Sequence, residues 1–268
     1  MFVLIAGLLL LFILFSLRYG WWRQSVSSDH PRILMYHMVT EHRDGAKFNK
    51  LRVRPAAFDS QIGWLSENGY YFALMSELVN PDALPPKTVV LTFDDGFEDN
   101  FIHAHPVLLK YNAKATLYLV QDRFDRDWSV SKKAHHNSGE LKDETKLTDA
   151  QVRQMLDSGC WELGGHTRTH VNLSRLNQAE KIQEISGSKQ ALEQKFDTQL
   201  SSFAYPFGIY DLLDTDIVQQ AGFDTAVTTV EGIDENIMAS CFELKRVKIS
   251  GKDGNLAFRI RMRTGQRG

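Results

Sequence analysis

The chain has 268 residues, 31 basic and 33 acidic side chains, and a formal net charge of −2. This balance gives no reason to expect a nucleic-acid partner, because domains that bind nucleic acid carry an excess of Lys and Arg. A domain of more than about 200 residues buries most of the surface of its unfolded chain, so disulfides or a structural metal are not needed merely for folding.

The first part of the chain predicts a membrane anchor. Residues 2 to 17 carry no charge, and Trp21 and Trp22 follow them. As a helix this run spans about 24 Å, and Trp is favoured where a helix leaves the bilayer. A cleaved signal peptide is the alternative, but no basic residue precedes the apolar run. We predict an anchor over residues 1–23, a linker over 24–31 and one main domain over 32–268.

The anchor is predicted to cross the inner (cytoplasmic) membrane once. Arg18 and Arg23 follow the apolar run, and no Lys or Arg precedes it. Because basic residues tend to stay on the cytoplasmic side, this asymmetry favours a main domain that faces the cytoplasm.

Strand and helix patterns alternate along the main domain. Short runs rich in β-branched and aromatic residues indicate strands, and apolar residues at helical spacing indicate helices. About seven strands alternating with helices predict an α/β fold, an incomplete (β/α) barrel with its site at the carboxyl ends of the strands. The predicted strands are residues 32–36, 89–93, 115–120, 161–165, 202–205, 225–229 and 244–249, and the predicted helices are 55–69, 101–110, 148–158 and 179–196.

Two adjacent carboxylates end the second predicted strand, which runs into Asp94 and Asp95 before Gly96 makes a turn. Like charges this close raise one another's pKa unless a cation neutralises one of them. The pair therefore predicts one metal ligand and one base. The alternative is a solvated turn, since Asp-Gly is a common turn dipeptide.

Two histidines lie four residues apart, at His166 and His170, directly after two glycines. Imidazoles at this spacing reach one ion from a helical turn or from a strand end that runs into a loop. The glycines favour the strand end, and Thr167 stands where the helical zinc-protease motif needs Glu. A lone pair of this kind is usually incidental, but together with the Asp pair it predicts a metal site.

These four side chains together predict an acyl hydrolase. Asp95, His166 and His170 offer one carboxylate and two imidazoles and leave coordination positions open, which is typical of a catalytic metal. Such an ion lowers the pKa of its water and polarises an acyl oxygen. Asp94, which is not required as a ligand, can take the proton of that water.

The chain resembles the polysaccharide deacetylases, the NodB-homology domain of carbohydrate esterase family 4. The family motif Thr-Phe-Asp-Asp-Gly is matched in full by residues 92–96, and His-Ser/Thr-x-x-His by residues 166–170. The similarity runs from about residue 31 to 249 and includes Tyr-Pro-Phe-Gly at 205–208. The resemblance implies a distorted seven-stranded barrel.

The resemblance also implies the roles of the site residues. It makes Asp94 the base and Asp95, His166 and His170 the ligands of a divalent metal ion. Zinc is the expected ion, and cobalt or nickel could serve. The implied reaction removes acetyl from N-acetylglucosamine-type residues of a bacterial surface glycan.

The chain departs from the family motifs at two positions: one motif lacks its arginine, and another lacks the histidine that serves as general acid. In place of Arg-x-Pro-Tyr-Gly the chain has Ala-Tyr-Pro-Phe-Gly at 204–208, so the Arg that orients the base is absent. In place of Leu-x-His it has Leu-Lys-Arg at 244–246, so the His that acts as general acid is absent. An arginine cannot serve as that acid, because a guanidinium keeps its proton in proteins.

We therefore expect Arg246 to replace the missing Arg beside Asp94, and His37 or a metal-bound water to protonate the leaving amine. The alternative for Arg246 is a solvated position on its strand. Tyr205 and Phe207 are the expected substrate and oxyanion contacts. The backbone N–H of Phe207 is the expected donor, since a proline precedes it and has no N–H.

The stretch from residue 122 to 145 is polar and charged, and it predicts a surface excursion. His135 and His136 within it are expected to be solvated, and Trp128 is a candidate for stacking on a sugar.

Other classes fit part of this pattern. One Asp and two His also describe iron(II) oxygenases, and a metal-dependent phosphoesterase could use the Asp pair. Neither explains the Tyr-Pro-Phe-Gly segment. A membrane-tethered glycan-binding protein without turnover is a further alternative, because the Leu-x-His motif is missing.

The substrate depends on the side of the membrane. A cytoplasmic domain favours a lipid-linked precursor such as a lipopolysaccharide core sugar. An outward-facing domain, as in the best-known members of the family, favours poly-N-acetylglucosamine or peptidoglycan. The two indications disagree, and the side stays open at this point.

Overall fold

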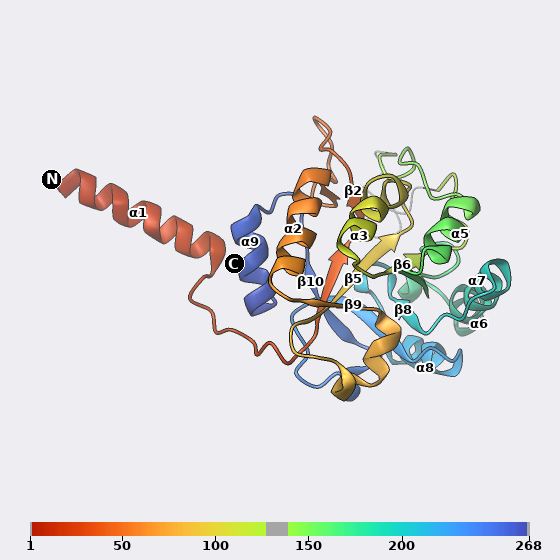
Figure 1. The fold of residues 1–268 in the computed structure, drawn as a ribbon. Helices are drawn as coiled ribbons and strands as arrows, with labels where there is room; N and C mark the ends of the chain where they lie inside the picture. Colours follow the sequence, from red (N-terminus) through yellow and green to blue (C-terminus); the bar gives the residue numbers. More distant parts are fainter. Residues whose placement is uncertain (1, 127–138, 267–268) are drawn as a thin grey trace.

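A closed barrel of seven parallel strands forms the centre of the computed structural model, which describes residues 2–126 and 139–266 (Figure 1). The α/β class and the number of strands agree with the sequence. The barrel is closed rather than incomplete, because β1 pairs with both β5 and β10. In order around the ring, the strands are β1 (Arg32–Tyr36), β10 (Leu244–Lys248), β9 (Thr225–Glu231), β8 (Ser202–Ala204), β7 (Trp161–Gly165), β6 (Ala115–Leu119) and β5 (Thr88–Asp95).

The strand β5 has three neighbours. One edge pairs with β1, and the other pairs first with β4 (Tyr71–Ala73) and then with β6. All residues of β5 are buried. This strand carries Asp94 and Asp95, so the surrounding sheet fixes the position of both carboxylates. A separate small sheet joins β2 (Met38–Val39) to β3 (Arg52–Val53).

Helices cover the outside of the barrel (Figure 1). The helix expected at 101–110 begins with a π-helical turn, η3, and the one expected at 179–196 is interrupted by another, η5. Such insertions are frequent near functional sites. The covering elements are α2 (Pro55–Glu67), η3 (Asn100–Ala104), α3 (His105–Tyr111), α5 (Asp149–Asp157), α6 (Gln178–Ile182), η5 (Gln183–Gly187), α7 (Ser188–Phe196), α8 (Leu212–Gln220) and α9 (Asn255–Thr264).

Short 3-10 turns lie between these elements. Their bounds are η1 (Met75–Val79), η2 (Pro81–Ala83), η4 (Leu173–Arg175), η6 (Pro206–Gly208) and η7 (Met238–Ser240).

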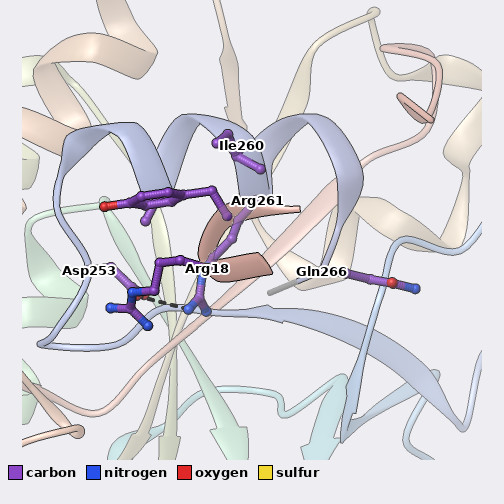
Figure 2. A pocket seen from close by; sticks show the side chains of 7 residues that line it. Arg18, Asp253, Ile260, Arg261 and Gln266 are labelled. Atoms are coloured by element: carbon purple, nitrogen blue, oxygen red, sulfur yellow. Dashed lines mark hydrogen bonds and ion pairs between the residues drawn. The ribbon is translucent and has the colours of Figure 1, made fainter. Parts of the chain in front are cut away.

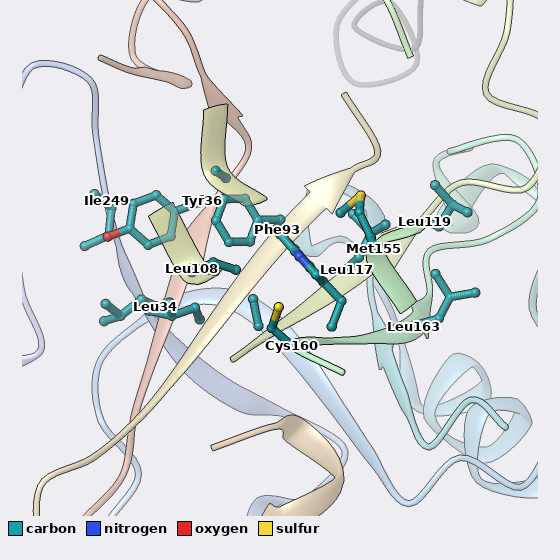
Figure 3. Packing of buried hydrophobic residues seen from close by; sticks show 14 of the residues in the cluster. Leu34, Tyr36, Phe93, Leu108, Leu117, Leu119, Met155, Cys160, Leu163 and Ile249 are labelled. Carbon is teal, nitrogen blue, oxygen red and sulfur yellow. The ribbon is translucent and has the colours of Figure 1, made fainter. Parts of the chain in front are cut away.

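Alternation along β5 directs its side chains to two different layers. Leu91 and Phe93 belong to the large apolar cluster between barrel and helices, where Phe93 stacks on Tyr36 at 5.3 Å (Figure 3). Val90 belongs to a smaller cluster to which six barrel strands contribute residues, and which therefore fills the barrel interior. Because successive strand residues face opposite sides, Asp94 points into the interior with Val90.

The N-terminal helix α1 (Phe2–Tyr19) extends away from the barrel (Figure 1). Among the described residues, no helix is both long enough and apolar enough to span a bilayer. The transmembrane helix expected over residues 2 to 17 is therefore not supported.

A small pocket lies where the end of α1 meets α9 (Figure 2). Arg18 and Tyr19 line it together with Arg261, which pairs with Asp253 at 2.9 Å. None of the site residues expected from the sequence lines this pocket.

Candidate active site

Asp95, His166 and His170 converge at the carboxyl end of the barrel. Asp95 ends β5, His166 follows β7, and His170 lies in the loop beyond it. The Oδ1 atom of Asp95 lies 3.4 Å from Nε2 of His166 and 3.2 Å from Nε2 of His170. One ligand atom from each residue lies within 4.8 Å of the others, and all three side chains are buried. The structure thus brings together the three ligands expected from the sequence.

The chemistry of this donor set fits a divalent metal ion. Within the described residues, the buried Oδ1 of Asp95 accepts no hydrogen bond. The Nδ1 atom of His166 lies 2.7 Å from the carbonyl oxygen of Ala204, which leaves its Nε2 directed toward Asp95. A hydrogen bond of this kind orients a metal-binding imidazole and selects its tautomer. One carboxylate and two imidazoles are a donor set that suits zinc.

The electrostatic environment favours the protonation states in which Asp95 and His170 can bind a cation. Burial alone would raise the pKa of Asp95, but the nearby imidazoles, His170 first, hold it well below its usual value. Burial lowers the pKa of His170 and so favours its neutral form. Metal ligands must be an ionised carboxylate and neutral imidazoles, and this site favours both states.

The backbone of the ligand loops lies in the left-handed region. Asp95, Thr167 and His170 have φ values of 80°, 62° and 54°. The backbone N–H of His170 donates to Oγ1 of Thr167 at 3.0 Å, which closes the turn between the two histidines. Non-glycine residues in this conformation are strained, and such strain concentrates at functional sites.

Gly164 explains why the histidine motif follows a glycine pair. A Cβ atom at this position would come within 2.5 Å of the Tyr118 ring and 3.1 Å of the Ser202 carbonyl oxygen. Only glycine therefore allows β7 to pack against these neighbours and deliver His166 to the site.

Asp94 is held by Arg246 across the barrel interior. The guanidinium donates two parallel hydrogen bonds, from Nη1 to Oδ1 at 2.7 Å and from Nη2 to Oδ2 at 2.8 Å. Its Nε donates to the carbonyl oxygen of Thr228 at 2.8 Å, and its Nη1 also donates to Oγ1 of Thr92 at 3.1 Å. Arg246 is fully buried. It therefore occupies the position expected of the missing arginine and not a solvated one.

The ion pair sets the charge of Asp94. Burial would raise the pKa of this carboxyl group, but the charge and hydrogen bonds of Arg246 outweigh burial and lower it. Asp94 is thus an ionised carboxylate beside the proposed metal ligand Asp95.

His37 lies between β1 and β2, at the edge of the same site. Its Nε2 is 3.9 Å from Oδ2 of Asp94, and its side chain is 18% exposed. The imidazole therefore lies near Asp94 and is also partly exposed to solvent.

The structure separates the two residues expected to contact substrate. Phe207, in η6, packs its ring edge-on against His170 at 4.5 Å and has a φ of 59°. Tyr205 is fully buried, stacks on Tyr210 at 4.3 Å, and donates its backbone N–H to the carbonyl oxygen of Val227. A substrate contact by Tyr205 is therefore not supported, because its ring lies in the core and its N–H is used in the sheet.

Three other residues considered from the sequence, Trp128, His135 and His136, lie outside the described residues. Asn100 was not anticipated. It is fully buried at the start of η3 and donates to the carbonyl oxygen of His37 at 2.8 Å. The sequence shows only a polar residue directly before the predicted helix at 101–110, which does not indicate this contact.

Comparison with known proteins agrees with this geometry. A family model described as polysaccharide deacetylase matches residues 82–226, more than half of the chain. YxkH of Bacillus subtilis (strain 168), which is named as a polysaccharide deacetylase, is 30% identical over 230 residues, or 84% of this chain and 74% of YxkH. A poly-β-1,6-N-acetyl-D-glucosamine N-deacetylase of Staphylococcus aureus (strain MRSA252) is 25% identical over 181 residues, or 63% of this chain and 58% of that enzyme.

Solved structures show the same likeness. The crystal structure of a polysaccharide deacetylase from Bacillus cereus aligns with a TM-score of 0.73 at 26% identity, covering 87% of this chain and 69% of that one. The deacetylase PplD of Streptococcus pyogenes, solved with acetate, aligns with a TM-score of 0.70 at 27% identity, covering 85% of this chain and 95% of that one. The chain belongs to the polysaccharide deacetylase family and is a hydrolase of amide carbon–nitrogen bonds.

Proposed function

We propose that this protein removes acetyl groups from N-acetylglucosamine-type residues of a bacterial surface glycan. The observation that supports this best is the pairing of two differently held carboxylates. Asp95 faces two histidines, whereas Asp94 is tied to Arg246 by two hydrogen bonds. This difference supports Asp95 as a metal ligand and Asp94 as the base.

Asp95, His166 and His170 would hold the divalent ion. When bound, such an ion supplies a Lewis acid and makes water a better nucleophile at neutral pH. Asp94 takes the proton of the attacking water. Arg246 keeps Asp94 ionised and fixes the direction of its oxygens, so the base is ready before the substrate arrives.

The leaving amine needs a proton, and His37 is the proposed donor. Its Nε2 lies 3.9 Å from the carboxylate that would hold the proton taken from water. An imidazole is suited to proton transfer near neutral pH. The backbone N–H of Phe207 is the proposed oxyanion donor, and the packing of its ring on His170 places η6 beside the ligand set.

The names of the relatives support the proposed substrate class. The S. aureus relative is named for poly-β-1,6-N-acetyl-D-glucosamine. We propose an N-acetylglucosamine polymer of this type as the first substrate to test. A peptidoglycan strand and a lipopolysaccharide core sugar are the other candidates.

The decisive experiment measures acetate release by the full chain. Oligomers of β-1,6-linked N-acetylglucosamine are offered to metal-stripped protein and to protein reloaded with zinc, cobalt or nickel. We expect release only after reloading. Binding of the oligomer without release would favour the glycan-binding alternative, and release of phosphate from a phosphate ester would favour a phosphoesterase.

Localisation at the inner membrane stays a prediction. It depends on the uncharged residues 2 to 17 and on the exposed apolar side chains of α1, such as Leu8 and Leu14. A reporter fused after Gly268 tests it together with the side on which the main domain lies.

A further inference from the structure

Asn100 links the segment that carries Asp94 and Asp95 to the segment that carries His37. Its Nδ2 donates to the carbonyl oxygen of His37 at 2.8 Å and to Oδ1 of Asp99 at 2.8 Å. The two linked segments are far apart in sequence but meet at the same edge of the site.

Asp99 provides a second connection to the same stretch of backbone. Its Oδ1 accepts the backbone N–H of Val39 at 2.8 Å. The two side chains thus bind the peptide groups on either side of Met38: the carbonyl of His37 and the N–H of Val39. Because Oδ1 of Asp99 accepts both hydrogen bonds, it also turns the amide of Asn100 with its NH₂ group toward His37.

The backbone that carries His37 joins the barrel strand β1 to the short strand β2. Among the described residues, the two-residue strand β2 pairs with the equally short β3 in a separate two-stranded sheet. So short a ladder fixes the backbone weakly, and the side chains of Asn100 and Asp99 add two hydrogen bonds to it.

Packing alone does not explain an asparagine at position 100. It is fully buried, and its Oδ1 accepts no hydrogen bond from any described residue. A buried polar atom without a partner destabilises the fold, so its presence calls for an explanation. The bond from Nδ2 to His37 supplies one.

We propose that Asn100 is a positioning residue that holds His37 at the correct distance from Asp94. This inference rests on the proposed deacetylation, in which His37 protonates the leaving amine. Asn100 is not one of the residues of the candidate metal site, and it acts through the backbone of His37.

The test compares an amide with an activated ester. An N-acetylglucosamine oligomer has an amine leaving group that needs a proton, whereas 4-nitrophenyl acetate has one that does not. For Asn100→Ala we expect kcat on the amide to fall by about tenfold to a hundredfold, because small displacements of a catalytic group have effects of this size. Ester hydrolysis should change by less than about twofold, since it needs no general acid.

A double-mutant cycle identifies the route of the effect. If Asn100 acts through His37, then adding Asn100→Ala to His37→Ala produces no further loss on the amide. The matched control is Gln61→Ala, which removes another buried amide, one that accepts the hydroxyl of Tyr36 at 2.9 Å. We expect this control to leave the ratio of amide to ester turnover unchanged.

Two results would overturn the inference: equal losses on amide and ester, or a full additional loss in the His37→Ala background. If the wild-type protein releases no acetate with any metal, the proposed function fails and the positioning role is judged by NMR. In that case the ring signals of His37 in the full chain should shift or broaden in Asn100→Ala but not in Gln61→Ala. Unchanged His37 signals in Asn100→Ala would refute the positioning role separately.

Discussion

Two carboxyl groups in the same barrel, Asp94 and Glu162, are held in opposite ways. Asp94 lies at the carboxyl end of β5 and receives two hydrogen bonds from Arg246. Glu162 lies near the amino end of β7 and accepts from the Thr116 hydroxyl at 2.6 Å and the Ser76 backbone N–H at 3.2 Å. The first partner is a cation, whereas the second set is neutral.

Their pKa values move in opposite directions. Burial raises the pKa of both carboxyl groups. For Asp94 the charge of Arg246 outweighs burial, and the pKa is lowered. For Glu162 the hydrogen bonds from Ser76 and Thr116 do not outweigh burial, and the pKa is raised. The cation, and not the depth of burial, decides which end of the barrel keeps an ionised base.

The largest effect is expected from removing Asp95, a proposed metal ligand at the carboxyl end of the barrel. Asp95→Ala eliminates the only carboxylate of the described ligand set. We expect acetate release to fall by about three orders of magnitude, because the charge stabilisation supplied by the ion is lost. Bound metal, measured by atomic emission, should fall in parallel. Wild-type turnover with normal metal content would show that Asp95 is not a ligand.

Removing Arg246 tests the cation directly. Arg246→Ala leaves Asp94 buried without its partner, and breaking a buried ion pair costs about 3–5 kcal/mol in the free energy of unfolding. Turnover should fall as well, because the base loses its orientation. Arg246→Lys is the matched control, since it keeps the charge but not the two parallel hydrogen bonds. We expect Lys to restore part of both losses in urea unfolding and acetate release. An Ala variant with unimpaired turnover would exclude a role for Arg246.

Glu162→Gln changes the buried carboxyl group at the amino end of the barrel. We expect it to raise the free energy of unfolding, by less than Arg246→Ala lowers it. The raised pKa means that stability from the protonated form is present at acidic pH and is lost as pH rises through the folded-state pKa. Gln stays neutral and avoids that loss. At about pH 8 the free energy of unfolding of the variant, measured by urea unfolding, should exceed that of wild type by about 1 kcal/mol. The difference should vanish near pH 4. Acetate release should not change. A variant less stable than wild type at both pH values would contradict this account.

The convergence of Asp95, His166 and His170 could be predicted because parallel strands end at one edge of a barrel. The partner of Asp94 was harder to foresee, since Arg246 lies 152 residues away. Its contact was expected only because a family motif lacked its arginine. The closing pair of β1 and β5 was not foreseen, because a pattern of strands does not show where a sheet ends.

Backbone conformation and tertiary hydrogen bonds were beyond the sequence pattern. The positive φ of Asp95, Thr167 and His170 arises at non-glycine residues, where local preference opposes it. The burial of Tyr205 was not foreseen, because it depends on tertiary contacts with Tyr210 and Val227 just beyond the end of β8. The bond from Asn100 to His37 spans 63 residues and has no local signal.

The ion pair between Asp94 and Arg246 joins β5 to β10 through the barrel interior. The residue proposed as the base therefore also contributes to holding the barrel together. In the proposed mechanism, each proton that Asp94 accepts removes, for that moment, its negative charge and with it the ion pair between the two strands. An inactive variant meant to trap an intact glycan for crystallography should therefore leave Asp94 in place. His37 is the better position to change, because its imidazole lies at the rim and neutralises no buried guanidinium.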